Sequence, residues 1–417
     1  MPVANEPRMD RRAFLKTTVA AAAVIPFGSS YWRAFASHEA PVAGPGPYGP
    51  LGAADPNGLR LPAGFSSRLI ARSAEPVGDT SHVWHFFPDG GATFATDDGG
   101  WIYASNAEVD SRGGGVGAIR FASDGAIVDA YRILSSTTRN CAGGVTPWGT
   151  WLSCEETEGG LVWECDPTGQ ADAMPRLALG SFSHEAAAVD PVTSYCYLTE
   201  DQSDGRFYRF RPDPTLVPLP SEAARLLERG TLEVAKLADP AAASTGGTAV
   251  EWLPVPVPNP PSVLIVESVP TRRQVPESTA FNRGEGCWFD TVARTVFFST
   301  TGDNRIWAHE VDDASIEVYF DGKATAGSPL RAPDNLTVAP SGDLLVCEDG
   351  DNLEMVLISA DGEVAPFLRL EGEQHRSTEL TGCAFDPSGT RLYFSSQRGY
   401  AIGATYEVTG PFRTERV

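Results

Sequence analysis

Short runs of apolar, β-branched and aromatic residues recur along the chain, and each run ends in polar residues. Helix signals are sparse: only residues 221–237 are predicted to be partly helical, with Ser221 as the N-cap. Gly, Asp and Pro separate the runs, which is typical of an all-β protein. Six runs share this shape: WIYASNAE (101–108), TWLSCEE (150–156), CYLTED (196–201), VFFSTTGD (296–303), DLLVCEDGD (343–351) and RLYFSSQRG (391–399).

The polar ends of these runs are regularly spaced. The intervals are 49, 45, 101, 47 and 49 residues if the following positions are equivalent: Asn106, Glu155, Glu200, Thr301, Glu348 and Gln397. The doubled interval predicts one long insertion, at about 212–274, which contains the Pro-rich stretch VPVPNPPS. Each run is preceded by a turn and another strand, as in HEAAAVDPVTSYCYLTED. This arrangement predicts β-hairpins whose open ends bring two polar clusters to one edge.

A repeat of roughly 40–50 residues with about four strands per unit is typical of a propeller blade. We therefore predict a six-bladed β-propeller with one long insertion between blades 3 and 4. The early strand at 65–72 (FSSRLIAR) is expected to complete the last blade and so close the ring. A pair of packed sheets, a β-sandwich, is the alternative fold.

The first 36 residues are predicted to be a twin-arginine signal peptide. Arg11-Arg12 precedes Phe-Leu-Lys, an apolar run at 17–27 follows, and Ala34-Phe35-Ala36 resembles a cleavage site. Residues 37–417 would then form the propeller, exported to the periplasm or beyond by the twin-arginine translocation machinery. We expect a monomer with no membrane span, because the chain has no other apolar run of about 18 residues.

Charge and cysteine content narrow the possibilities further. The formal net charge of −22 disfavours nucleic acid and anionic lipid as partners. The chain has seven cysteines, and no disulfide is predicted among them. Cys154 and Cys347 occupy equivalent strand positions and are expected to be packing residues. Cys141 precedes Gly143-Gly144 in a loop, where a small apolar side chain would add little packing free energy. We therefore favour a ligand role for Cys141.

In a propeller the innermost strands line the central channel, so the hairpin ends should gather polar residues at one mouth. Two carboxylates about 4 Å apart repel by roughly 4 kcal/mol at an effective dielectric near 20, so they need protons, cations or metals. Arg283 is the one cation that we place there, which favours metal. The predicted set comprises Asp89, Asn106, Glu108, Asn140, Cys141, Glu155, Glu156, His184, Glu185, Glu200, Asp201, Arg283, Glu285, Asp334, Asn335, Glu348, Asp349, Glu379 and Gln397.

The donor types in this set allow more than one metal. Oxygen ligands favour calcium, whereas the Cys141 thiolate and His184 beside carboxylates allow a transition metal such as iron or zinc. The alternative interpretation is that Asp and Asn at the strand ends only form turns, and that His184 only makes hydrogen bonds.

Several segments resemble the PhoX-type alkaline phosphatases (DUF839-like), twin-arginine-exported bacterial enzymes on a six-bladed propeller. The similar segments are NGLRLPAGF, NCAGGVTPWGTWLSCEE, SHEAAAVDP with YLTED, FNRGEG, PDNL with CEDG, and ELTGCAF. The resemblance implies an iron pair and several calcium ions at the channel mouth, with Arg283 as the catalytic phosphate clamp and with Asn140 and His184 beside the substrate. It implies these metal ligands: Glu108, Cys141, Glu155, Glu156, Glu185, Glu200, Asp201, Glu285, Asp334, Asn335, Glu348 and Asp349.

These expectations combine into a function. We expect a metal-dependent phosphatase that hydrolyses phosphate monoesters, with the metals neutralising the phosphate and activating the nucleophile. Phosphodiesterase or phytase activity is a closely related alternative to this interpretation. An acidic channel mouth also suits a calcium-dependent lactonase or gluconolactonase-like hydrolase, or a metal-bound propeller without enzymatic activity.

Overall fold

The computed structural model describes residues 41–261, 268–350 and 352–416. The chain has one large compact unit, His38–Val417, and the predicted signal peptide at 1–36 lies outside the described residues. Regular structure is almost entirely β. The six helical segments of the described residues are short 3-10 turns: η1 (Leu177–Leu179), η2 (Pro220–Leu227), η3 (Ala242–Ser244), η4 (Thr271–Arg273), η5 (Glu373–His375) and η6 (Gly399–Ala401). No helix in the described part of the chain is long and apolar enough to cross a membrane.

The strands form five hydrogen-bonded sheets. The first contains β4 (Pro88–Ala95), β5 (Trp101–Ala107), β6 (Gly114–Phe121) and β7 (Ile127–Thr137). The second contains β8 (Asn140–Val145), β9 (Trp151–Glu155), β10 (Val162–Cys165) and β11 (Met174–Pro175). The largest has nine strands, in the order β12 (His184–Val189), β13 (Cys196–Glu200), β14 (Phe207–Pro212), β15 (Gly230–Leu237), β16 (Thr248–Pro254), β20 (Ser315–Asp321), β19 (Arg305–Glu310), β18 (Thr295–Thr300) and β17 (Gly284–Asp290).

Two sheets near the C-terminus incorporate strands from the beginning of the domain. One contains β21 (Pro333–Val338), β22 (Leu344–Glu348), β23 (Glu354–Ile358) and β24 (Glu363–Leu370), joined by β1 (Val42–Ala43) and β2 (Leu59–Arg60). The other contains β25 (Leu380–Phe385), β26 (Arg391–Ser396), β27 (Ala404–Thr409) and β3 (Ser66–Arg72). The predicted pairing of the early strand at 65–72 with the last sheet is confirmed, since β3 pairs antiparallel with β27.

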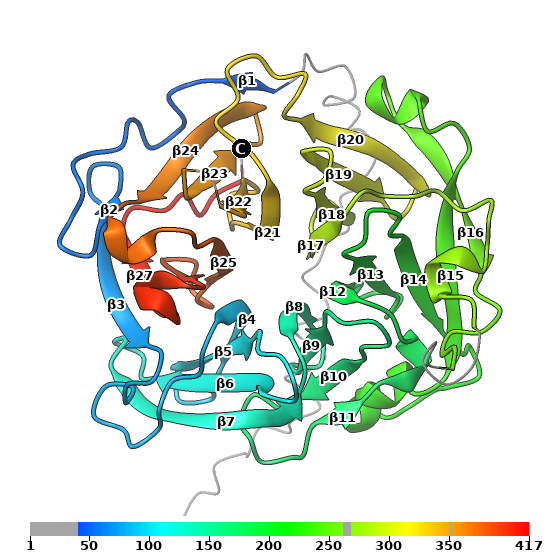
Figure 1. Ribbon diagram of the computed structural model, residues 1–417, viewed down its shortest axis with the longest axis horizontal. Coiled ribbons are helices and arrows are strands. Elements are labelled where there is room, and N and C mark those ends of the chain that lie inside the picture. The colour runs from blue at the N-terminus through cyan, green and yellow to red at the C-terminus, as the bar shows by residue number, and fades with distance from the viewer. Residues whose placement is uncertain (1–40, 262–267, 351, 417) are drawn as a thin grey trace, which may run out of the picture. The chain divides into compact units, whose positions relative to one another are not determined.

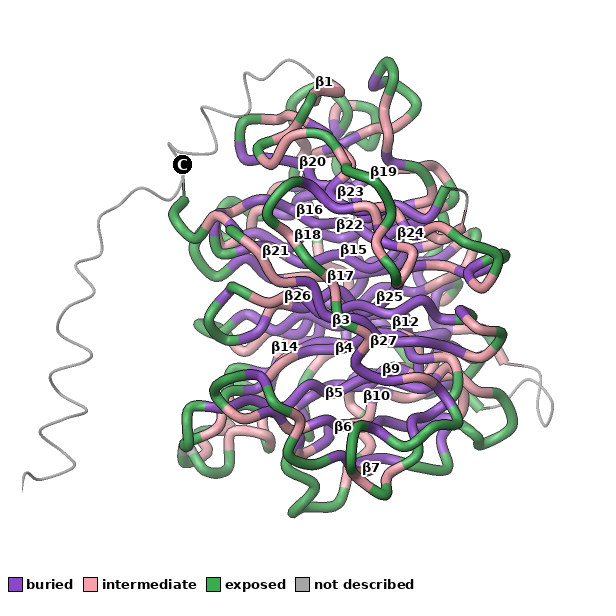
Figure 2. Tube along the Cα trace, turned by 90° about the vertical axis from the view of Figure 1, so that its left-hand side faces the viewer, coloured by how far each residue is buried: buried purple, intermediate pink, exposed green. Residues whose placement is uncertain are grey.

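The sheets stand side by side around a central axis, in a propeller-like arrangement (Figure 1). The first strands of six hairpins lie nearest this axis, and each contacts the next in the order β4, β8, β12, β17, β21, β25 and back to β4. Most strand residues are buried while the connecting loops are exposed (Figure 2). The arrangement is not the alternative β-sandwich, in which two sheets stack face to face.

Apolar side chains between neighbouring sheets form the core. Tyr103 of the first sheet stacks on Tyr393 of the last, with ring centroids 5.0 Å apart. Phe207 and Phe298 stack in the same way at 4.2 Å, within the nine-stranded sheet. All seven cysteines are free thiols, and Cys154 and Cys347 are buried among apolar side chains, which confirms their predicted packing role.

The stretch at 212–274 contains more regular structure than its sequence predicts. The predicted helical character of 221–237 is only partly present, because η2 ends at Leu227 and the remainder is the strand β15. The predicted N-cap is also wrong: Leu219 precedes η2, and its side chain makes no cap hydrogen bond. Residues 230–234 pair with β14 and residues 233–237 pair with β16, and this tertiary pairing outweighs local helix propensity.

Each innermost hairpin has a register shift at the same place in its first strand. The two residues inside each shift are Asp89-Gly90, Cys141-Ala142, Glu185-Ala186, Glu285-Gly286, Asp334-Asn335 and Gly382-Cys383. Such bulges bend a strand and redirect a side chain. The second residue is Gly in two of the six bulges, where neighbouring backbones are close: a Cβ on Gly90 would lie 2.5 Å from the Cα atom of Ala142.

Candidate metal centre

Five of the six bulges place an acidic or thiol side chain at one end of the ring. These residues are Asp89, Cys141, Glu185, Glu285 and Asp334, and all of them line a cavity of about 220 Å³. Residues that follow the second strands, or that immediately precede the first strands, complete its walls. The remaining lining residues are Glu108, Arg139, Glu156, Asp201, Arg283, Asp349, Glu379, Gln397 and Arg398.

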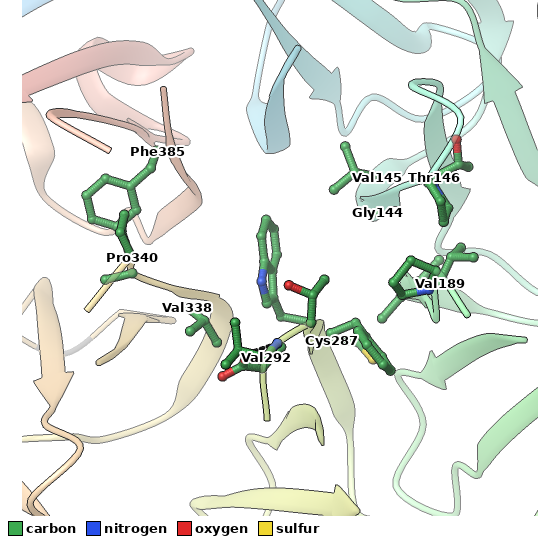
Figure 3. Close-up of a pocket in the computed structure, with 18 of the residues that line it drawn as sticks. Gly144, Val145, Thr146, Val189, Cys287, Val292, Val338, Pro340 and Phe385 are labelled. Atoms are coloured by element: carbon green, nitrogen blue, oxygen red, sulfur yellow. Dashed lines mark hydrogen bonds between the residues drawn. The ribbon is translucent and has the colours of Figure 1, made fainter. Parts of the chain in front are cut away.

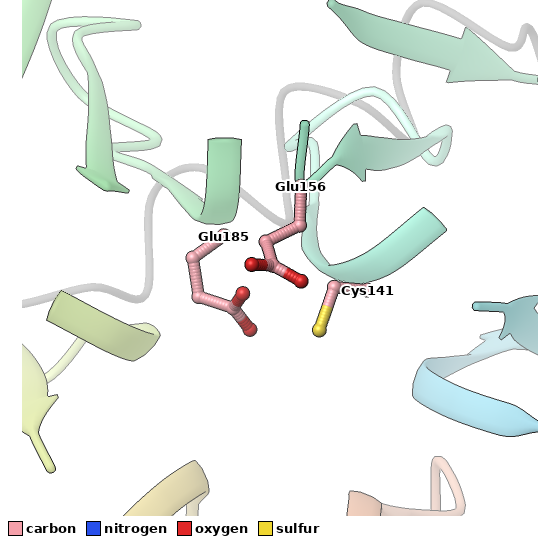
Figure 4. A group of neighbouring side chains, drawn as sticks. All are labelled: Cys141, Glu156 and Glu185. Atoms are coloured by element: carbon pink, nitrogen blue, oxygen red, sulfur yellow. The ribbon is translucent and has the colours of Figure 1, made fainter. Parts of the chain in front are cut away.

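Two groups of side chains in this cavity could each hold a metal ion. In one, ligand atoms of Cys141, Glu156 and Glu185 lie within 4.8 Å of one another. The three side chains point toward a common space (Figure 4). In the other, carboxylate oxygens of Glu185, Glu285 and Asp334 meet the same distance limit. Glu185 belongs to both groups and therefore links them.

The Glu185 carboxylate is 1% exposed, and neither of its oxygens has a hydrogen-bond partner. Burial raises its pKa well above the usual value, and the charges of Glu285 and Asp334 raise it further. Buried carboxylates elsewhere in the chain accept hydrogen bonds, as expected for such costly groups. A cation between the two ligand groups would neutralise these oxygens, so the donor set fits a metal.

Cys141 is placed in the same environment. Burial raises the pKa of its thiol well above the usual value, and the charges of Asp89 and Glu185 add to the effect. The Asn106 amide holds this segment by donating to the carbonyl oxygens of Cys141, at 3.0 Å, and Ala142, at 2.8 Å. Since a metal deprotonates a coordinating thiol outright, a cation would reverse the pKa shift of Cys141.

Glu156 and Glu379 are carboxylates of the cavity wall with strongly raised pKa values. Burial raises the pKa of Glu156 to about 8, even though Arg139 Nη2 donates to its Oε2 at 2.6 Å. Burial and the charge of Asp349 raise the pKa of Glu379 to about 7, although Arg398 donates to it. Even with arginine partners, the cavity disfavours further negative charge.

Arg283 lies at the mouth of the cavity, as predicted. Its Nε and Nη2 donate to the two oxygens of Asp201 at 3.0 and 3.1 Å. Nη2 is also 2.9 Å from Glu285 Oε1, an ion pair whose geometry does not make a hydrogen bond, and Nη1 is 3.9 Å from Asp349. The hydrogen bonds to Asp201 and the nearby carboxylate charges raise the pKa of Arg283.

The prediction that Arg283 is the only cation of the site is wrong, because Arg139 and Arg398 also line the cavity. Arg139 and Arg283 occupy equivalent positions, each immediately before the first strand of its hairpin and each with a positive φ, 50° and 57°. The sequence contains this signal in Arg139-Asn140 and Arg283-Gly284, directly ahead of Cys141 and Glu285. Arg398 follows β26 and carries no comparable signal.

Three predicted ligands lie outside the cavity lining because backbone N–H groups occupy their carboxylates. Glu155 accepts from the N–H groups of Thr138 and Leu161 at 2.8 and 3.1 Å. Glu200 and Glu348 each accept from the N–H six residues further on, at 3.2 and 3.0 Å. These carboxylates tie the loop after each second strand to the hairpin, while the next residue in each case, Glu156, Asp201 or Asp349, lines the cavity.

The predicted neutral site residues are likewise buried and bonded within the protein. Asn140 donates to Ser153 and accepts from Thr137, while Asn335 donates to Asp334 and accepts from the Gly382 N–H. His184 Nε2 is 3.1 Å from the carbonyl oxygen of Gly180. Burial lowers its pKa to about 3, so its imidazole is neutral. None of the three is among the residues that line the acidic cavity.

The predicted equivalence of the hairpin ends also needs correction in three units. In each hairpin, one residue of the second strand lies opposite the residue that precedes the bulge. This residue is Ala107 in β5, Thr300 in β18 and Ser395 in β26. Spacing in the sequence instead predicts Asn106, Thr301 and Gln397, because a run of polar residues does not show which one ends the pairing. Asn106 is therefore a buried bridge and not a residue of the cavity lining.

The opposite ends of the same inner strands surround a different cavity. It measures about 440 Å³, and its lining includes Val145, Val189, Val338 and Phe385 (Figure 3). Between the two lies a space of about 30 Å³ lined largely by Gly and Ala from the bulges, enough for roughly one water molecule. The channel is therefore narrow at its centre, between the two cavities.

The sequence of the chain matches the family described as "Alkaline phosphatase PhoX" over residues 103–162, 158–318 and 306–399. The chain belongs to this family. No curated protein sequence matches it.

Solved structures agree at the level of the fold. One similar structure is PhoX of Pseudomonas fluorescens in complex with vanadate, a transition-state analogue. It is 17% identical in sequence, with 87% of this chain and 97% of that chain covered, and the TM-score is 0.68. A Bacteroides thetaiotaomicron protein of unknown function is 12% identical, with 82% and 76% covered and a TM-score of 0.50. A gluconolactonase of Xanthomonas campestris is 14% identical, with 87% of this chain and 98% of that chain covered. Its TM-score is only 0.48, so the two structures are less similar.

Proposed function

We propose that the protein is a metal-dependent phosphatase that hydrolyses phosphate monoesters in the acidic cavity. The observation that carries this proposal is the buried Glu185 carboxylate, which has no hydrogen-bond donor and is shared by two groups of potential ligands. Membership of the alkaline phosphatase family supports the same reaction.

We further propose that the scaffold is a six-bladed propeller. The nine-stranded sheet then comprises two blades, β12–β15 and β17–β20, bridged by β16. This interpretation is supported by the short β16–β20 pairing, which involves only Thr248 and Ala249 opposite Ile316 and Ser315. The insertion between blades 3 and 4 would include β16 and the segment after it, and residues 1–36 would direct export through the twin-arginine pathway.

The two ligand groups differ in chemistry, so we assign them different metals. Iron fits Cys141, Glu156 and Glu185, because a thiolate beside carboxylates suits a transition metal. Calcium fits Glu185, Glu285 and Asp334, which offer only oxygen. Glu108, Asp201 and Asp349 are further candidates from the cavity wall. Glu155, Glu200, Glu348 and Asn335 leave the ligand set because they are not among the residues that line the acidic cavity.

The chain's own residues would bind and orient the phosphate. Asp201 fixes the Arg283 guanidinium through Nε and Nη2, which leaves Nη1 available to donate to a non-bridging phosphate oxygen. The narrow centre of the channel keeps the leaving group on the solvent side of the cavity. When bound, the metals would neutralise the phosphate charge and polarise its P–O bonds.

Hydrolysis of p-nitrophenyl phosphate by metal-loaded and chelator-treated protein tests the proposal. We expect activity to disappear with the metals and to return when iron and calcium are restored. Full activity after exhaustive metal removal would exclude the proposed function. Cys141→Ser separates it from a calcium-dependent lactonase: phosphatase activity and bound iron should both be lost, whereas a lactonase would retain calcium and lactone hydrolysis.

A further inference from the structure

Three guanidinium groups form the solvent-facing rim of the acidic cavity. The side chains of Arg139, Arg283 and Arg398 are 37%, 40% and 45% exposed. Beside Arg398 the carboxylates are more deeply placed, at 11% for Glu108 and 13% for Glu379. Beside Arg283 and Arg139 there are also exposed carboxylates, Asp349 at 37% and Asp110 at 81%. An anion that approaches the Arg398 side of the rim therefore meets a cation first, although the formal charge of the chain is −22.

The three arginines differ in their relation to the proposed metal ligands. Arg139 is paired with Glu156, and Arg283 lies against Glu285, so each touches one of the two ligand groups. Arg398 instead contacts Glu379, which is not a proposed ligand, and Glu108, which belongs to neither of the two ligand groups and is only a further candidate from the cavity wall. Arg398 therefore stands at the mouth but away from the place where we put the reacting phosphate.

The backbone of Arg398 is fixed, while one edge of its guanidinium stays open. Its N–H donates to Thr378 Oγ1 at 2.8 Å, and its Nη1 donates to Glu379. Its Nη2 lies 3.7 Å from Glu108, beyond hydrogen-bond distance. A planar guanidinium can bind one carboxylate at one edge and a second anion at another. Glu108 does not fill this edge at a distance of 3.7 Å, and its position is fixed by Gln397 and Arg139, which donate to its oxygens.

We propose that Arg398 is a specificity-determining residue that binds a second anionic group of the substrate. This inference rests on the proposed phosphatase function. The substrate class is then a phosphate monoester whose alcohol part carries another anion, either a carboxylate or a second phosphate. The reacting phosphate lies near Arg283, and the second anion pairs with the open edge of Arg398.

Matched substrates test the inference with metal-loaded protein. 3-Phosphoglycerate and glycerol 3-phosphate differ by a carboxylate in place of a hydroxymethyl group, and propane-1,3-diol bisphosphate and its monophosphate differ by the second phosphate. For the wild-type protein we expect kcat/KM to favour the doubly anionic member of at least one pair, mainly through KM. The pair that shows the preference identifies the second anion.

Arg398→Gln should reduce that preference by about tenfold or more, since a charge-assisted hydrogen bond is lost. Arg398→Lys should retain part of it by keeping the charge. Arg376→Gln is the matched control, because this arginine is 73% exposed and pairs only with Glu373 in the described structure. If Arg398 only neutralised Glu108 and Glu379, its loss would change kcat/KM for both members of a pair equally.

The outcomes separate this inference from the function on which it rests. If the loaded wild-type protein fails to hydrolyse p-nitrophenyl phosphate, the proposed function is wrong and the inference falls with it. If it hydrolyses that ester but prefers neither doubly anionic substrate, or if Arg398→Gln keeps the wild-type preference, only the role of Arg398 is overturned. Should Arg398→Gln not fold, an undiminished preference in Arg398→Lys together with Arg398→Ala would overturn it as well.

Discussion

Glu185 should affect stability in opposite directions with and without metal. In the metal-free protein its carboxylate faces Glu285 and Asp334, with ligand atoms within 4.8 Å. At an effective dielectric near 20, each ionised pair at that distance repels by about 3.5 kcal/mol. Glu185→Gln removes two of the three pairs, so a fully ionised cluster would be relieved of about 7 kcal/mol. Partial protonation in the wild-type protein reduces the gain.

Even half of that relief is a large fraction of the roughly 5–15 kcal/mol that stabilises a folded protein. We therefore expect Glu185→Gln to raise the Tm of chelator-treated protein by about 3 °C or more. In the metal-loaded protein the same substitution removes a ligand from both proposed ions, so it should lower the Tm and the bound metal. Thermal unfolding followed by circular dichroism, in chelator and in metal, measures both effects.

Glu155→Gln is the matched control for this experiment. The Glu155 carboxylate accepts two backbone N–H groups and the Trp163 indole N–H, all away from the cavity lining. Its loss should lower the Tm by a similar amount in chelator and in metal. The electrostatic reasoning about Glu185 is refuted if Glu185→Gln lowers the Tm of the chelator-treated protein, or if its effect has the same sign under both conditions.

Three further predictions concern the scaffold. Asn106→Ala removes the amide that holds the Cys141 carbonyl. Chemical denaturation should show that the free energy of unfolding falls by about 3 kcal/mol, and elemental analysis should show less iron. A variant with wild-type stability and full iron content would contradict this. Gly382→Ala places a Cβ atom 2.5 Å from the Asp89 carbonyl oxygen, on a residue whose φ is +65°. The Tm should therefore fall, and an unchanged Tm would be evidence against the close contact. Burial lowers the pKa of His309 to about 4 from 6.5, so the unfolded chain binds a proton at a higher pH than the folded protein does. The free energy of unfolding should therefore fall by up to about 3 kcal/mol as the pH falls from 6.5 to 4. Urea unfolding should show a shallower loss between pH 6.5 and 4 for His309→Gln, and an unchanged slope would exclude the histidine as its cause.

The hairpins could be predicted from the sequence because their signals are local. Apolar runs of five to eight residues, bounded by Gly, Asp and Pro, define both the strands and the turns. The same reasoning located Cys141, Glu156, Glu185, Asp201, Arg283, Glu285, Asp334 and Asp349, all of which line one cavity. Their gathering follows from the repeat, since each residue has an equivalent place in its own hairpin.

The incorrect predictions concern the direction in which a side chain points, and not the position of the residue along the chain. Successive residues of a strand point to opposite faces, so only one member of Glu155-Glu156, Glu200-Asp201 or Glu348-Asp349 can face the cavity. The sequence does not say which member does, because the bulges that set the direction leave no clear pattern. Arg139 and Arg398 were missed for a related reason: isolated basic residues beside strand ends look like ordinary surface positions.

The pairing of β3 with β27 has a consequence for the timing of biosynthesis. β3 (Ser66–Arg72) emerges from the ribosome early, yet its partner β27 (Ala404–Thr409) lies at the far end of the chain. Such a non-local contact makes folding slow, since a long loop must close before the contact forms. The last sheet, and with it the ring of inner strands around the acidic cavity, can be completed only after β27 has been synthesised. A stalled or truncated chain would therefore leave the cavity carboxylates without a closed scaffold to bring them together.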